Sequence, residues 1–158
     1  MVGSGGASAC VTVRQEVTGV TLKALDEMSS LFGGFFVPVR AELGVTSFGI
    51  QVYRYPPRAR FVPPHDHAGN AGPDDRQEEI YTVLAGRARL LADQESFDLT
   101  PGVFATVRPD QLRQLVTDEE AAIILVIGGT PGAAYAPSPL TELGTTEQDI
   151  NDHRSGLA

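Results

Sequence analysis

Two histidines separated by one residue are the first side chains in this sequence that could do chemistry together. They are His65 and His67, in the run His65-Asp66-His67. If this run is extended, residues i and i+2 point to the same side of the strand, so both imidazoles project together. Two neighbouring imidazoles can bind a transition-metal ion. The alternative is a surface turn with two solvated histidines.

A glutamate downstream could complete such a site. Residues 78–86 read Glu-Glu-Ile-Tyr-Thr-Val-Leu-Ala-Gly. In a strand, alternation sends Glu79, Tyr81 and Val83 to one face and the residues between them to the other. One carboxylate is therefore expected to face the same interior as Tyr81 and Val83.

These residues resemble the first motif of the cupin superfamily, which reads H-x-H, a gap, then E, six residues and G. Six residues separate Glu79 from Gly86, so Glu79, and not Glu78, matches the metal-binding position. Gly86 matches the tight turn into the next strand. The resemblance covers about residues 46–128. It implies an all-β fold, the cupin double-stranded β-helix or jelly-roll barrel, and a metal site formed by His65, His67 and Glu79.

The gap within this motif is unusually long. Eleven residues, 68–78, stand where a short gap is usual. The resemblance places this insertion at the mouth of the barrel. There it could act as a lid over the pocket. Alternatively, it could be a surface loop without a function, because loops tolerate insertions at little entropic cost.

The second cupin motif departs from its pattern at Arg113, which stands where the fourth ligand, a histidine, is expected. The guanidinium stays protonated and cannot ligate a metal. About 4 Å from a divalent ion it would meet a repulsion of about 8 kcal/mol at an effective dielectric constant of about 20. Of the three histidines, His153 lies in the C-terminal tail, so the composition leaves at most a three-ligand site.

Three arrangements of Arg113 remain open. In the first, the three ligands hold a metal with the donor set of non-haem Fe(II) oxygenases, and Arg113 swings to the rim, where it could grip a substrate carboxylate. In the second, Arg113 pairs with Glu79 and no metal binds. In the third, Arg113 points outward and Gln111 or Gln114 supplies a weak oxygen ligand.

Two classes of function follow. The first is a protein with a mononuclear metal site that acts on or binds a small carboxylated or oxygenated molecule; as an enzyme it would catalyse oxygenation, isomerisation or decarboxylation. Its ion would be Fe, Mn, Ni or Zn, without a nucleotide cofactor. The alternative is a metal-free binding or regulatory cupin in which Arg113 holds an organic anion. The candidate substrate-binding residues are Arg113, Tyr81, Gln111 and Tyr53.

The elements that must position these residues are short strands. From residue 45 onward, apolar runs end at turn residues about every 8–12 positions, which is typical of an antiparallel sandwich or barrel. Ile123–Ile127 is apolar on both faces, which predicts a central strand. The spacing of apolar residues over Thr21–Leu31 predicts a short N-terminal helix. The expected strands are 46–54, 60–65, 79–84, 87–92, 96–99, 103–108, 112–117 and 121–127.

Composition limits the class of protein and its partners. The chain has 158 residues, 42% of them hydrophobic, which fits one globular domain. A net charge of −8 without a basic run argues against nucleic acid. No apolar stretch reaches the roughly 18–20 residues of a membrane span. A single cysteine cannot form an intramolecular disulfide, which favours the cytoplasm.

The expected organisation is a flexible N-terminus (residues 1–10), a single cupin domain (11–136, with its barrel core at about 46–128) and a polar C-terminal tail (137–158). The resemblance also implies a homodimer. Residues near Val11–Arg14 would then join a partner chain, and the other partner would be a small-molecule ligand.

Overall fold

The computed structural model describes residues 19–69, 75–146, 148–149 and 152. The predictions for residues 1–10 and Val11–Arg14 lie outside these residues, as do His153 and the middle of the 68–78 insertion. Within the described residues, no helix is long and apolar enough to cross a lipid bilayer.

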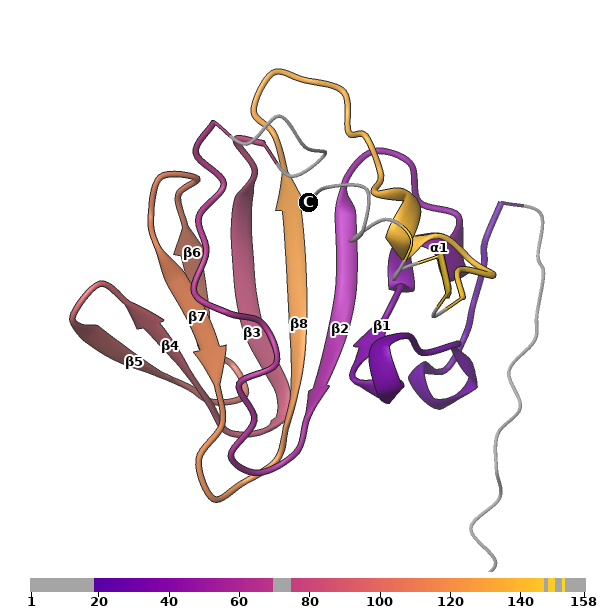
Figure 1. Ribbon diagram of the computed structural model, residues 1–158. Coiled ribbons are helices and arrows are strands. Elements are labelled where there is room, and N and C mark those ends of the chain that lie inside the picture. The colour runs from indigo at the N-terminus through magenta and orange to yellow at the C-terminus, as the bar shows by residue number, and fades with distance from the viewer. Residues whose placement is uncertain (1–18, 70–74, 147, 150–151, 153–158) are drawn as a thin grey trace, which may run out of the picture.

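In the part of the chain described, eight strands form two antiparallel sheets (Figure 1). The larger sheet has the order β1-β2-β8-β3-β6, and the smaller has the order β5-β4-β7. The strands are β1 Phe36–Val37, β2 Gly49–Tyr55, β3 Glu78–Gly86, β4 Ala88–Ala92, β5 Glu95–Leu99, β6 Phe104–Val107, β7 Arg113–Val116 and β8 Ala122–Gly129.

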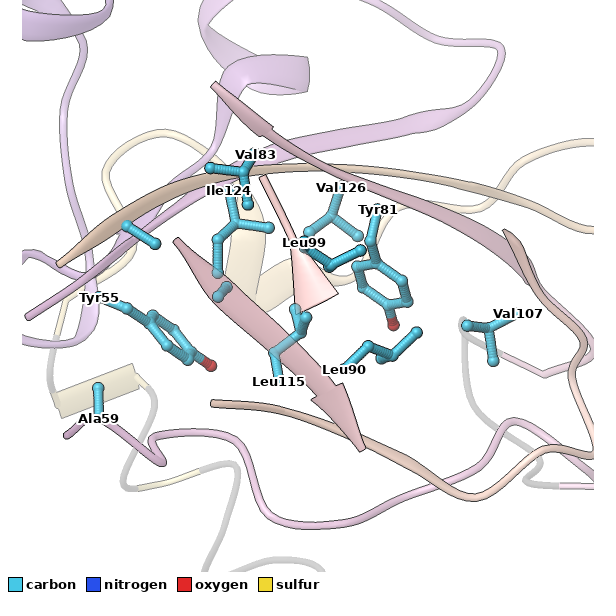
Figure 2. Packing of buried hydrophobic residues seen from close by; sticks show 12 residues of the cluster. Tyr55, Ala59, Tyr81, Val83, Leu90, Leu99, Val107, Leu115, Ile124 and Val126 are labelled. Carbon is cyan, nitrogen blue, oxygen red and sulfur yellow. The ribbon is translucent and has the colours of Figure 1, made fainter. Parts of the chain in front are cut away.

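The hydrophobic core lies between the two sheets. Burial along β8 alternates strictly, and Ile124 and Val126 are fully buried on its inner face. Figure 2 shows these residues facing Leu90 and Leu115, which come from the smaller sheet. The predicted all-β jelly-roll barrel is confirmed, and so is the central position of the 121–127 strand.

The predicted helix over Thr21–Leu31 is wrong. This segment contains only one 3₁₀ turn, η1 (Leu25–Glu27), and a second turn, η2 (Phe32–Gly34), follows it. Isolated helices of this length are marginal in water, and here the apolar side chains do not share one face, since Leu22 is half-exposed. The short helix of the region is α1 (Val39–Leu43), and a further 3₁₀ turn, η3, spans Pro139–Thr141.

The predicted strand over Arg60–His65 is also wrong. Pro63 and Pro64 lack the backbone N–H that a ladder needs, so the segment runs beside β7 without forming a continuous strand. One bridge remains at its end, where His65 N donates to Arg113 O at 3.1 Å and Arg113 N donates to His65 O at 2.9 Å. This bridge joins a candidate metal ligand, His65, to Arg113, the residue that stands at the position of the fourth cupin ligand.

Gly86 ends β3 with the left-handed backbone conformation that suits glycine, at φ 76°. A Cβ atom at this position would lie 1.9 Å from the carbonyl oxygen of Ala121. Both observations explain why the tight turn between β3 and β4 requires glycine.

Candidate metal centre

The three side chains that resemble cupin ligands converge inside the barrel. The ligand atoms of His65, His67 and Glu79 all lie within 4.8 Å of one another. His65 is fixed by its bridge to β7, and His67 N donates to Pro109 O at 2.7 Å. Glu79 points inward from β3, as alternation predicts. This group could hold a metal ion.

Both imidazoles are oriented by backbone carbonyl oxygens. His65 Nδ1 lies 2.9 Å from Pro63 O, and His67 Nδ1 lies 3.3 Å from Gln77 O. A carbonyl oxygen only accepts hydrogen bonds, so Nδ1 of His65 carries the proton in the neutral ring and its Nε2 bears the lone pair. Metal-binding histidines usually have the arrangement of His65, because a donor bond from one nitrogen orients the other toward the ion. Nδ1 of His67 lies 3.3 Å from the Gln77 acceptor and 2.8 Å from the Arg113 donor, so these contacts do not fix its tautomer.

Glu79 is buried, and its hydrogen bonds in the described residues fall on one oxygen. Tyr81 Oη and Arg113 Nη2 both donate to Oε2 of Glu79. Its other oxygen, Oε1, accepts from neither group. A carboxylate held through one oxygen can ligate through the second, so these contacts are compatible with a metal at Oε1.

Arg113 is 1% exposed and forms an ion pair with Glu79. Of the three arrangements that the sequence left open, the structure has the Arg113–Glu79 pair of the second, and it contradicts the third, in which Arg113 points outward. The side-chain amide of Gln114 donates instead to Val62 O, at 3.0 Å. The pleat of β7 explains the result, because Arg113 lies two residues before the core residue Leu115 and shares its inner face, whereas Gln114 between them is only half-buried.

The guanidinium also touches His67. Arg113 Nη2 lies 2.8 Å from Nδ1 and 3.0 Å from Nε2 of His67. The lone pair or N–H bond of each ring nitrogen points outward in the ring plane, and the two directions diverge. A single Nη2 atom at similar distances from both nitrogens therefore cannot be aligned with both directions. Arg113 therefore lies against the imidazole without matching the lone-pair direction of both nitrogens.

Burial and charge act on the two polar partners of Glu79. Burial and the neighbouring carboxylate of Glu79 raise the pKa of Tyr81 well above its ordinary value. Burial lowers the pKa of Arg113, but the charges and hydrogen bonds of Glu79 and Tyr81 together outweigh it, and the net shift is upward. At neutral pH, Tyr81 is thus a neutral donor and Arg113 a cation.

The donor set fits a divalent metal. Two neutral imidazole nitrogens and one carboxylate oxygen leave open positions on an ion, and Fe, Mn, Ni and Zn all accept these ligands. Arg113 is the single feature that opposes binding, because its positive charge lies against two of the three ligands.

Two other sequence candidates have different surroundings. Gln111 is partly exposed; its side-chain amide donates to Leu112 O at 3.1 Å, and its backbone oxygen lies 3.4 Å from Arg113 Nη1. Tyr53 packs in an aromatic cluster, where its ring centroid lies 5.7–6.0 Å from those of Phe35, Phe36 and Tyr55.

Two contributors to the site were not identified from the sequence. One is the backbone oxygen of Gln77, which orients His67. The other is Gly128, opposite Glu79 in the register of β3 and β8. A Cβ at Gly128 would lie 2.7 Å from Gln77 Oε1 and 3.6 Å from Glu79 Cγ. No local pattern in the sequence marks Gly128, because the register that places it opposite Glu79 is a tertiary feature.

Comparisons with known proteins bear on the fold. No protein-family model and no curated protein matches the sequence. A cupin protein from Bacteroides fragilis is similar in structure, with a TM-score of 0.58 and 19% identity over 77% of this chain and 93% of that one. A sugar phosphate isomerase of the cupin superfamily from Silicibacter pomeroyi has a TM-score of 0.52 and 24% identity over 68% and 75%. The barrel described above is therefore a cupin fold.

Proposed function

We propose that this protein binds one divalent metal ion through His65, His67 and Glu79, and that it acts on or binds a small carboxylated or oxygenated molecule there. The observation that carries the proposal is the orientation of the ligands. His65 Nδ1 lies against a backbone carbonyl and Glu79 is held through Oε2, so His65 Nε2 and Glu79 Oε1 remain as ligating atoms, and His67 completes the set once Arg113 moves away from its ring.

The neighbouring residues have separate tasks in this proposal. Tyr81 holds the carboxylate of Glu79 in place, and Arg113 supplies a cation that can orient an anionic group of the ligand. A bound ion would supply Lewis acidity toward an oxygen of that ligand. Oxygenation, isomerisation and decarboxylation remain the candidate reactions, because one fold supports many chemistries.

Elemental analysis after loading with Mn²⁺ and exhaustive dialysis tests the metal site. We expect about one ion per chain in the wild type, and less than about a tenth of this in His65→Ala/His67→Ala and in Glu79→Gln. The matched control is Glu78→Gln, since Glu78 is the exposed neighbour on the opposite face of β3. Equal, substoichiometric Mn²⁺ in all four proteins would rule out the proposed site.

One observation favours a second candidate function, a metal-free binding or regulatory protein. The guanidinium of Arg113 already pairs with Glu79, so the buried carboxylate has a counter-charge without an ion. In this case Arg113 holds an organic anion directly. Small carboxylates would then raise the melting temperature equally with EDTA and with Mn²⁺, whereas the metal-dependent function requires the ion.

The cytoplasmic location and the homodimer belong to the same proposal. The location is supported by the single cysteine of the chain, which excludes an intramolecular disulfide. The homodimer is supported by the exposed apolar face of the larger sheet, which is described in the Discussion.

A further inference from the structure

The guanidinium of Arg113 lies among the atoms that would bind a metal ion. Its Nη2 atom donates to Glu79 Oε2 and lies 2.8 Å and 3.0 Å from the two ring nitrogens of His67. One atom of Arg113 therefore contacts two of the three candidate ligands at once. A guanidinium carries donors and a positive charge but no lone pair, so it interacts with these groups as a cation does.

The guanidinium lies close to the lone pair of His67 in either tautomer. In the neutral ring, one nitrogen carries the proton and the other carries the lone pair. Whichever nitrogen bears the lone pair, Nη2 lies within 3.0 Å of that nitrogen. A bond from a metal ion to an imidazole nitrogen is about 2.1 Å long, so an ion on this lone pair would lie no more than about 5 Å from Nη2.

These three side chains are buried together. Arg113 is 1% exposed, and His67 and Glu79 are each 6% exposed, so water and salt screen their charges little. Arg113 already supplies the counter-charge of Glu79, and it keeps its proton at any ordinary pH. A divalent ion added to this arrangement would therefore face the guanidinium across one shared carboxylate.

From this geometry we infer that Arg113 is a competitor of the metal built into the chain. Loading of the site is an exchange, in which the ion displaces the guanidinium from Glu79 and His67. The inference rests on the proposed function and specifies what sets the metal affinity of its site. An exchange needs no room for both cations side by side, because each occupies the site only when the other has left it.

The other contacts of the guanidinium are weak enough to allow this exchange. Nη1 lies 3.4 Å from both His65 O and Gln111 O, and Nε lies 3.4 Å from Tyr81 Oη. Hydrogen bonds of this type are usually near 2.9–3.0 Å. The short contacts of Arg113 are thus made to Glu79 and His67, the same groups that the ion would bind. Tyr81 donates to Glu79 independently and can orient the carboxylate in both arrangements.

The opposite role for Arg113 would be to support the ligands from outside, as hydrogen-bond partners of metal ligands usually do. Removing such a supporting partner weakens metal binding by about 10–100-fold. Removing a competitor strengthens metal binding. The two roles therefore predict opposite signs for the same substitution, and the sign does not depend on any catalytic activity.

The test is the Kd for Mn²⁺ in equilibrium dialysis, measured on the full-length wild type and on variants whose circular dichroism matches it. We expect Arg113→Gln to lower the Kd by about tenfold or more, because like charges brought together at a binding site cost more than this factor. Arg113→Lys keeps a cation and should bind Mn²⁺ at least about threefold more weakly than Arg113→Gln. The matched control is Arg89→Gln, which removes an ion pair between Arg89 Nη2 and Asp118 at 2.6 Å and should leave the Kd unchanged.

A measurement on the wild type keeps the inference testable if the variants do not fold. Nuclear Overhauser contacts between the guanidinium protons of Arg113 and the ring of His67 can be followed as Zn²⁺, a diamagnetic ion, is added. We expect these contacts to be lost in proportion to the Zn²⁺ bound, because the guanidinium leaves the ring. Contacts that persist with one Zn²⁺ bound per chain would overturn the inference.

The outcomes distinguish the inference from the function beneath it. If neither the wild type nor Arg113→Gln binds Mn²⁺, the proposed metal site and the inference are both overturned. One Mn²⁺ per chain in both proteins, with an equal or higher Kd in Arg113→Gln, overturns the inference and leaves the metal site standing. Binding by Arg113→Gln alone supports the inference and overturns the metal-dependent function of the wild type.

Discussion

Glu78 and Glu79 are chemically identical neighbours in β3, and the pleat of the strand alone separates their environments. Glu78 faces solvent, whereas Glu79 is buried and accepts hydrogen bonds from Tyr81 and Arg113 on Oε2. A carboxylate in this position needs neighbouring space as well as donors. Gly128 supplies that space, because its missing side chain leaves room for Gln77 and Glu79.

The first prediction concerns this glycine. Gly128→Ala should push aside the side-chain amide of Gln77 and place a methyl group against Glu79 Cγ, and should weaken Mn²⁺ binding by up to about tenfold, as changes beside metal ligands do. The control is Gly129→Ala, because a Cβ at Gly129 would meet no atom within 4 Å. Equilibrium dialysis with Mn²⁺ measures both variants. Equal Kd values for the two would show that the close approach at Gly128 has no influence on the ligands.

At the scale of elements, the segment around η1 is held against α1 by one buried carboxylate. Ser29 N donates to Glu42 Oε1 at 2.8 Å, and Lys23 Nζ donates to Oε2 of the same residue. These bonds take the place of helical hydrogen bonds in residues 21–31. The apolar side chains of Leu25 and Met28 pack against Val37, Val39 and Val52.

The second prediction is a pH dependence at Glu42. Burial raises the pKa of Glu42. The hydrogen bonds from Lys23 and Ser29, together with the charge of Lys23, lower the pKa by more than burial raises it, so the net pKa lies below 4.5. The folded state therefore favours the carboxylate. Its stabilisation is complete above about pH 4.5 and is lost as the pH falls through the lowered pKa.

Glu42→Gln should accordingly lower the free energy of unfolding by about 1–3 kcal/mol at pH 7, and the difference from the wild type should shrink at lower pH. Urea unfolding at several pH values measures this. The control Glu27→Gln changes an exposed carboxylate on η1 and should stay within about 0.5 kcal/mol. A constant deficit for Glu42→Gln at every pH would contradict the prediction.

At the scale of the whole molecule, the residues that the structure describes cover only part of the outer face of the larger sheet. The segment with η1 and α1 covers β1 and β2, and it flanks this side of the sheet in Figure 1. On β3 and β6 the same face leaves apolar side chains exposed: Ile80 is 42%, Leu84 50% and Phe104 71% exposed. Such a patch is typical of a surface that meets another chain.

The third prediction is that a second copy of this chain covers that patch. Multi-angle light scattering should give twice the mass of the chain for the wild type. Phe104→Asp should shift the protein to the monomer, because it places a charge in the centre of the apolar contact. The control Phe97→Asp changes a half-exposed phenylalanine on β5, in the other sheet, and should leave the dimer intact. A monomeric wild type would contradict the expected homodimer.

The sequence by itself determined the class of fold, most strand positions and the face on which Glu79 lies. These properties depend on alternation and on turn residues, which are local. It also limited the candidate metal site to at most two histidine ligands beside Glu79, because the composition offers only three histidines and one of them lies in the tail. The expected helix over 21–31 and strand over 60–65 were wrong where tertiary contacts and two prolines outweighed the local pattern.

Only the tertiary structure decided the state of Arg113 and the orientation of the ligands. Whether a guanidinium turns inward or outward depends on which strand lies opposite it, and β7 places Arg113 beside Glu79 of β3. The carbonyl beside His67 belongs to Gln77, which the fold brings close to it, whereas the carbonyl beside His65 belongs to Pro63, only two residues earlier in the chain. Spacing in a sequence determines which side chains share a face, whereas charge pairing and close approach depend on residues that are distant along the chain.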